Sequence, residues 1–239
     1  MSAAPAARRA PARRAPIHDV VWGLLDGSIA AAERRNGTDG VAVLDAGCGR
    51  ASLLRPFRPR ITRFVGADIH PPAAGALPYL DEFAAVDLCA DAGAFRAASF
   101  DVILSNFTVE HFADPVAAFR NLRGWLRPGG RLVITTVNRR HPFVAAYLAL
   151  PASVRSRLQG LVKASAADAH PLIGACNDVE SVRGALADVG FEKVDVLTVG
   201  HLAGAWGRTR PTRLLGLAGD ALARGIPSRR STIVASAEA

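Results

Sequence analysis

Two glycines and an aspartate have the residue types and the spacing of a ligand site. Gly47 and Gly49 follow a buried apolar segment at 41–45 and precede a segment at 52–57 that is compatible with a helix. Glycine lets the backbone approach a ligand closely, and the first N–H groups of a helix can face a negative charge. Asp68 ends a second apolar segment 21 residues after Gly47. Because a carboxylate accepts two hydrogen bonds at once, Asp68 suits a ligand with two neighbouring hydroxyls.

The spacing of the small residues tests one class of ligand for this turn, the dinucleotides. A dinucleotide-binding turn, G-x-G-x-x-G/A, would place its third small residue at position 52. That position is Ser52, and the third small residue is instead Ala51. The turn therefore departs from the dinucleotide pattern.

Residues 44–51, Leu-Asp-Ala-Gly-Cys-Gly-Arg-Ala, resemble the first motif of class I S-adenosylmethionine-dependent methyltransferases, with Ala51 replacing the usual third glycine. Further matches follow in the order of that family. Residues 65–69 resemble the strand whose acid holds the ribose, and Asp91 with 99–101 resembles the segment whose acid contacts the adenine amino group, at a shorter interval than usual. Residues 105–111 and 126–133 resemble the end of the fourth strand and the turn into the fifth.

These matches cover about 41–138, and 177–191 resembles the following helix and turn of the small-molecule branch. The resemblance implies S-adenosylmethionine as the cofactor. The cofactor-binding residues that it implies are Asp45, Gly47, Cys48, Gly49, Asp68, Ile69, Asp91, Ala92 and Asn106.

The sequence says less about the methyl acceptor than about the cofactor. Methyl transfer from a sulfonium depends mainly on positioning, but a phenolic acceptor, with a pKa of about 10, also benefits from a proton acceptor. His111, just past the fourth strand, is the predicted catalytic residue, or else a structural histidine of the pocket wall. His141 and His170 are further candidates, or ordinary polar loop residues. The aromatic residues that would line an acceptor pocket, or else belong to the core, are Trp22, Phe107, Phe143 and Tyr147.

No metal is expected. In the quinone-pathway O-methyltransferases that the chain resembles, a Glu-Val-Val-Glu-His stretch has been linked to a divalent metal, and this chain lacks the first acid of that stretch. The three cysteines lie far apart in the sequence, without the spacing of a zinc site or a disulfide framework.

Strand-like and helix-like segments alternate, which indicates an α/β fold with a mostly parallel sheet covered on both faces. The resemblance implies a Rossmann-like sheet of seven strands in the order 3-2-1-4-5-7-6, with the last strand antiparallel and helical lid insertions. The predicted strands are 41–45, 61–68, 84–88, 100–105, 131–137, 192–199 and 232–236. The predicted helices are 17–35, 71–80, 115–126, 141–163 with an interruption at Pro151, and 178–189 with Asn177 as its cap.

A single domain is expected over 17–239, with a helix at 17–36 and acceptor-side insertions at 138–177 and 202–226. Four arginines of a predicted disordered leader, 1–16, supply half of the net charge of +8, which leaves +8 − 4 = +4 for the domain. No apolar run reaches the ~18 residues of a membrane span, and no signal peptide is recognisable. A cytoplasmic protein without a membrane partner is predicted, and its oligomeric state stays open.

The predicted function is transfer of a methyl group from S-adenosylmethionine to a small organic acceptor, with oxygen as the accepting atom, in secondary metabolism. One alternative is methylation of RNA or protein, which the arginines near the C-terminus favour. Against it, residues 105–108 read Ser-Asn-Phe-Thr instead of the Asn/Asp-Pro-Pro-Tyr/Phe motif that holds an exocyclic base amine, so nucleic acid is an unlikely partner. The other alternative is a non-catalytic S-adenosylmethionine-binding module, which Ala51 makes conceivable.

Overall fold

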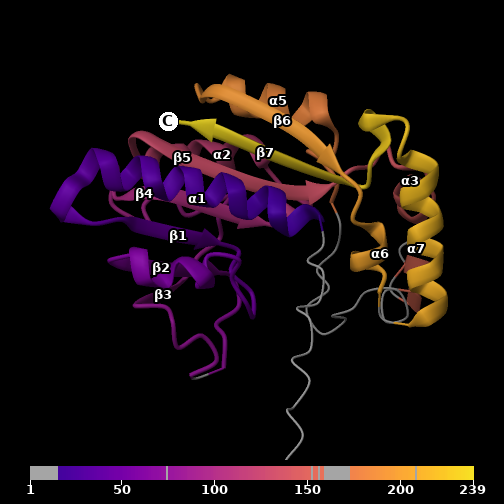
Figure 1. Ribbon diagram of the computed structural model, residues 1–239, viewed down its shortest axis with the longest axis horizontal. Helices are drawn as coiled ribbons and strands as arrows, with labels where there is room; N and C mark the ends of the chain where they lie inside the picture. Colours follow the sequence, from indigo (N-terminus) through magenta and orange to yellow (C-terminus); the bar gives the residue numbers. More distant parts are fainter. Residues whose placement is uncertain (1–15, 74, 152, 156, 159–172, 208) are drawn as a thin grey trace, which may run out of the picture.

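The computed structural model describes residues 16–73, 75–151, 153–155, 157–158, 173–207 and 209–239 (Figure 1). Residues 1–15 of the predicted leader and His170 therefore lie outside the described residues.

Seven strands form one sheet in the order β3-β2-β1-β4-β5-β7-β6, which confirms the predicted fold. Strands β1 to β5 pair in parallel, and β7 runs antiparallel to both β5 and β6. The strands are β1 (Ala42–Ala46), β2 (Arg63–Asp68), β3 (Glu82–Ala85), β4 (Phe100–Asn106), β5 (Leu126–Val137), β6 (Glu192–Val199) and β7 (Thr232–Glu238).

Helices cover both faces of the sheet because successive strand residues point to opposite sides. The α-helices whose bounds the structure describes are α1 (Pro16–Asn36), α2 (Pro115–Trp125), α3 (Pro142–Leu148), α5 (Val179–Asp188), α6 (Leu202–Ala205) and α7 (Arg210–Ala223). Short 3-10 helices span Gly37–Asp39, Arg55–Arg60, Val109–His111 and Pro227–Arg229.

Two apolar cores result from this arrangement. Val21, Leu25 and Ile29 of α1 share one core with Val43 and its neighbours on that face of the sheet. On the other face, α2 and α5 share a core with strand residues such as Leu44. Figure 1 shows α1 lying along one side of the sheet and α5 on the opposite side.

Several predicted details are wrong. The described residues of 71–80 contain no helix, because Pro71 and Pro72 begin the segment and Pro78 interrupts it. Residues 127–130, predicted as a turn, and Leu126, predicted as the last residue of a helix, are the beginning of β5. The cap of α5 is Asp178, whose carboxylate accepts a hydrogen bond from the backbone N–H of Ser181.

Helices α3, α6 and α7 stand together at one end of the sheet, beyond the arrowheads of β4 and β5 (Figure 1). They belong to the two segments that were predicted to lie on the acceptor side. None of the helices in the described part of the chain is long and apolar enough to cross a membrane.

Candidate functional site

The carboxyl ends of β1, β2 and β4 lie next to one another, because β1 pairs in parallel with both of the other strands. The glycine turn follows β1, Asp68 ends β2 and Asn106 ends β4. Ligands of open α/β sheets bind at this edge. The sheet thus brings together three segments that are far apart in the sequence.

Backbone hydrogen bonds fix the glycine turn to β2. The N–H groups of Gly47 and Cys48 both donate to the carbonyl oxygen of Ala67, at 2.7 and 3.1 Å. The N–H of Gly49 donates to Oδ2 of Asp68 at 3.0 Å. The turn and the carboxylate that was predicted to hold the ribose are therefore in direct contact.

Position 47 has room for glycine alone while Thr108 stays in place. Its φ is +82°, in the left-handed region, and a β carbon there would lie 2.2 Å from Oγ1 of Thr108. Thr108 follows β4, and its hydroxyl lies 3.4 Å from the carbonyl oxygen of Ala46. The segment after β4 therefore packs directly on the turn after β1.

The turn does not lead into an α-helix. Residues 55–60 form a 3-10 helix instead, because Pro56 and Pro59 lack the N–H groups that an α-helix needs. The N–H groups of residues 47–49 are already bonded within the fold. A pyrophosphate would find few free donors here, so this geometry disfavours a dinucleotide.

Asp45 is a buried carboxyl group beneath the turn. Its pKa is raised to about 7, mainly by burial. A hydrogen bond from Ser52 lowers the pKa, and the nearby charge of Asp68 raises it. Its Oδ2 atom is buried and has no hydrogen-bond partner among the described residues. An orphaned carboxyl oxygen beside an open turn fits a cationic or hydrogen-bond-donating ligand, as S-adenosylmethionine is.

Asp68 has the geometry of a diol acceptor. Its two carboxylate oxygens each accept one backbone N–H at 3.0 Å, Oδ2 from Gly49 and Oδ1 from His70. Each carboxylate oxygen can accept a second hydrogen bond, and the residue is half-buried. The neighbouring Ile69 is 52% exposed, so a large apolar side chain lies open beside this carboxylate.

Asp91 and Ala92 lie in an exposed turn beyond β3. The carboxylate of Asp91 accepts a hydrogen bond from the backbone N–H of Asp87 at 2.8 Å. Asp87 comes two residues after β3, and the intervening Val86 donates its N–H to the carbonyl oxygen of Asp68 at 3.0 Å. Asp87 is thus an exposed acid close to Asp68, which the sequence interpretation missed. An acid close to a strand end is the signal that could have found it, but the predicted strand 84–88 included this residue.

Asn106 and Cys48 are tied into the fold. The side-chain oxygen of Asn106 accepts a hydrogen bond from Oγ1 of Thr135 at 2.8 Å. The Cys48 thiol is buried, and burial raises its pKa to about 12. Cys48 is therefore protonated at neutral pH, and a ligand at the turn would meet its backbone and not a thiolate.

The predicted histidines occupy different environments. His111 ends the 3-10 helix after β4 and is half-buried. His141 is fully buried; its Nδ1 accepts the N–H of Phe143 at the start of α3, and burial lowers its pKa. His201, which the sequence interpretation did not single out, follows β6 at the same edge of the sheet and stacks on Phe107.

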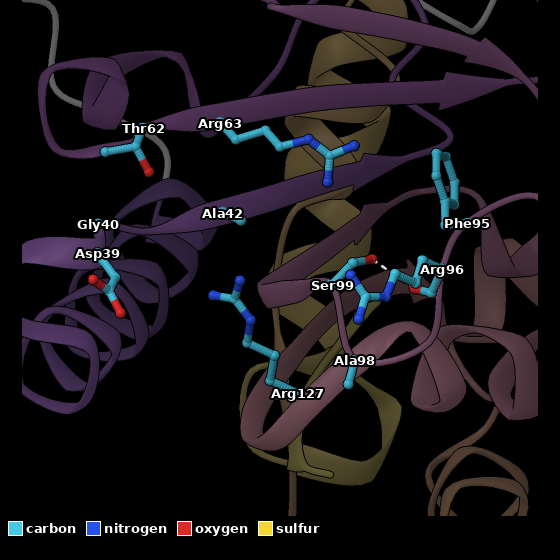
Figure 2. A pocket seen from close by; sticks show the side chains of 10 residues that line it. All are labelled: Asp39, Gly40, Ala42, Thr62, Arg63, Phe95, Arg96, Ala98, Ser99 and Arg127. Atoms are coloured by element: carbon cyan, nitrogen blue, oxygen red, sulfur yellow. Dashed lines mark hydrogen bonds between the residues drawn. The ribbon is translucent and has the colours of Figure 1, made fainter.

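The described chain also has a cavity of about 610 Å³, and this cavity is at the opposite edge of the sheet (Figure 2). Ala42 and Arg63, which begin β1 and β2, line it together with Ser99 and Arg127. Asp45 and Asp68 are not among its lining residues. The cavity is therefore separate from the glycine turn.

Solved structures share this fold. The phosphoethanolamine N-methyltransferase 2 of Haemonchus contortus, solved with S-adenosylhomocysteine, is 16% identical with a TM-score of 0.56, over 89% of this chain and 52% of that one. A SAM-dependent methyltransferase of Archaeoglobus fulgidus is 17% identical with a TM-score of 0.52, over 87% and 92%. The fold is that of the Rossmann-like S-adenosylmethionine-dependent methyltransferases.

A family model described as a methyltransferase domain matches residues 11–196. The chain therefore belongs to the methyltransferase domain family, and S-adenosylmethionine is the cofactor of this class of transferase.

Two curated relatives match part of the chain. A ubiquinone biosynthesis O-methyltransferase of Cereibacter sphaeroides is 36% identical over 107 residues, which are 42% of this chain and 43% of the relative. A protein of the same name from Ruegeria pomeroyi is 35% identical over 108 residues, 42% of each chain. The matches thus span less than half the length of these relatives.

Proposed function

We propose that the protein transfers the methyl group of S-adenosylmethionine to a hydroxyl oxygen of a small organic acceptor. The observation that carries the proposal is the contact between the glycine turn and the Asp68 carboxylate, 3.0 Å from the N–H of Gly49. An adenosyl compound suits this arrangement, because the turn can follow an extended ligand and the Asp68 carboxylate beside it can accept both ribose hydroxyls.

Each acid at the site has a separate role in this proposal. Asp68 accepts the two ribose hydroxyls, and the exposed side chain of Ile69 covers one face of the adenine. Asp87 contacts the adenine amino group in place of the predicted Asp91, since it lies beside the end of β2. Asp45 pairs with the cationic end of the cofactor, because its orphaned oxygen needs a partner.

When bound, the cofactor supplies a methyl group already activated by the positive sulfonium. The contribution expected of the protein is to hold the acceptor oxygen in line with that methyl group, which can lower the barrier by up to about 7–11 kcal/mol. Because the donor binds at the carboxyl edge, the acceptor would bind between the turn and helices α3, α6 and α7 (Figure 1). His111 is the proton acceptor that the sequence predicts.

Oxygen as the accepting atom is supported by the relatives, which are named as O-methyltransferases. They match only part of their length, so their names support oxygen as the accepting atom and do not identify the acceptor molecule. A role in secondary metabolism and a cytoplasmic location stay predictions.

Isothermal titration of the full-length chain with S-adenosylmethionine and S-adenosylhomocysteine tests the proposal. Asp68→Ala removes hydrogen bonds to a charged group, so both ligands should bind about 10- to 150-fold more weakly, equivalent to about 1.5–3 kcal/mol. Asp39→Ala, at the opposite edge of the sheet, is the matched control and should bind normally. The same titration with Asp87→Ala and Asp91→Ala decides which acid contacts adenine.

Wild-type protein that binds neither ligand would refute the proposal, and so would an unchanged dissociation constant for Asp68→Ala. Binding without methyl transfer to any member of a panel of phenols, alcohols, amines and RNA would favour the non-catalytic module instead.

A further inference from the structure

Four aromatic side chains from three separate segments meet at the carboxyl edge of the sheet. His18 and Trp22 lie one turn apart on α1, and their rings stack with centroids 6.0 Å apart. The ring of His201 lies 6.2 Å from that of His18 and 6.0 Å from that of Phe107, with only 28° between the planes of the latter pair. All four side chains are partly exposed, so they form a wall of rings and not a sealed core.

This ring wall (His18, Trp22, Phe107 and His201) borders the cofactor turn. Phe107 immediately precedes Thr108, whose side chain packs on Gly47. Phe107 has a φ of +53°, which is uncommon for a residue with a side chain. Its N–H donates to the backbone and side-chain oxygens of Thr135, both at 3.0 Å. The strained backbone is thus fixed by β5.

The position of His201 is set by contacts at its backbone and around its ring. Its N–H donates to Oγ of Ser231 at 2.7 Å, and that hydroxyl donates to Asp220 of α7 at 3.0 Å. A β carbon at Gly204 would lie 2.4 Å from the ring, so glycine makes the room that the ring fills. The imidazole itself makes no hydrogen bond to the residues that the structure describes.

The surroundings of His201 favour a neutral ring. Burial lowers its pKa from the ordinary value, and the nearby His18 lowers it further. Asp220, on α7, opposes them. A neutral imidazole with an unused nitrogen can accept a proton at neutral pH.

We propose that the ring wall binds a hydroxylated aromatic acceptor and that His201 accepts the proton of its reacting hydroxyl. This inference rests on the proposed function and adds the class of acceptor and the proton-accepting group. Aromatic faces bind flat rings through offset stacking, and a phenol needs help to lose its proton at neutral pH.

The proposed reaction transfers one proton and one methyl group. The acceptor O–H bond breaks and its proton moves to an imidazole nitrogen of His201, while the oxygen forms a bond to the methyl carbon and the carbon–sulfur bond breaks with its electron pair left on sulfur. The imidazolium then releases the proton to water.

The decisive variant is His201→Phe, because phenylalanine keeps a ring against Phe107 but cannot accept a proton. Catechol is added to the full-length chain saturated with S-adenosylhomocysteine, and the histidine ring resonances are followed by NMR. The resonance that His201→Phe removes should shift in the wild type. Its titration midpoint should move to lower pH, because a bound hydroxyl donates to the neutral ring.

Kinetics with catechol supply the second measurement. General base catalysis contributes about 10²–10⁴-fold, so His201→Phe should lower kcat by that factor and leave KM and the dissociation constant of S-adenosylhomocysteine nearly unchanged. The fall of kcat/KM at acid pH should also disappear. Phe107→Leu, in contrast, should raise KM more than it lowers kcat.

An unshifted His201 resonance on adding catechol would overturn the inference. So would full activity of His201→Phe, or loss of the acid limb in His111→Gln and not in His201→Phe. Each of these results can occur while the wild type binds cofactor and methylates an acceptor, so the proposed function would still stand. Failure of the wild type to bind cofactor would instead refute the proposed function itself.

Discussion

At the scale of single residues, we expect the buried Asp45 carboxyl group to link cofactor binding to pH. Its pKa is raised to about 7, so in the ligand-free protein it is largely protonated at pH 6. A cationic ligand favours the ionised form and lowers that pKa. Binding should therefore release a proton, and affinity should depend on pH.

The dissociation constant of S-adenosylmethionine should fall, by at most about tenfold per pH unit, as the pH rises towards about 7, and then level off. Titration calorimetry from pH 5.5 to 8, in buffers of different ionisation enthalpy, measures both the affinity and the released proton. Asp45→Asn, which cannot ionise, should remove the dependence. A wild-type affinity that is constant over this range would contradict the assignment.

At the scale of elements, the glycine turn is shaped by what packs on it. Gly47 and Gly49 both have positive φ, at +82° and +49°, but only Gly47 is covered by a side chain, that of Thr108. A β carbon at Gly49 meets no atom of the described residues within 4 Å. Substitutions at the two positions therefore separate the cost of a left-handed backbone from the cost of a clash with Thr108.

Gly49→Ala should lower the free energy of unfolding by about 1–2 kcal/mol, the cost of a left-handed conformation for a residue with a side chain. Gly47→Ala should lower it by about 1–3 kcal/mol more, because Thr108 must also move. Urea denaturation monitored by circular dichroism measures both. Equal destabilisation by the two substitutions would mean that Thr108 yields at no cost.

At the scale of the whole molecule, the carboxyl and amino edges of the sheet contribute differently to function and stability. The carboxyl edge holds the candidate site, and the amino edge holds the buried carboxylate of Asp101. That carboxylate accepts hydrogen bonds from the backbone N–H of Ala42 in β1, from Asn36 and Arg35 of α1, and from Arg127 of β5. The Asp101 side chain, itself on β4, thus joins α1 to β1 and β5.

Burial alone would raise the pKa of Asp101, but these four donors outweigh it and lower that pKa. The stabilisation is therefore present above the pKa of about 4 of the unfolded chain and is lost as the pH falls through the lower folded value. Asp101→Asn should lower the free energy of unfolding at pH 7 by about 2–4 kcal/mol, because Arg35 and Arg127 lose their partner. Urea denaturation measures this change.

The same variant should bind S-adenosylhomocysteine with unchanged affinity once it is folded, because Asp101 lies at the edge away from the site. Wild-type stability in Asp101→Asn would show that solvent or the new amide satisfies these donors at no cost.

Local patterns were enough to predict most elements of the fold. The apolar run at 41–45 identified a strand because strand formation and burial depend on near neighbours in the sequence. Gly47 and Asp68 could be recognised for a similar reason, since a tight turn and an acid at a strand end are local features. The prolines of 71–80 were also visible, and their effect on the predicted helix was underestimated.

The sequence by itself therefore determined the alternation of strands and helices, the glycine turn and the acid that contacts it. Only the tertiary structure placed Asp87 beside Asp68 and brought His201 against Phe107, because those contacts join segments that no local pattern relates. Residues at the ends of different parallel strands become neighbours through strand pairing, and strand order is set by the packing of the whole sheet.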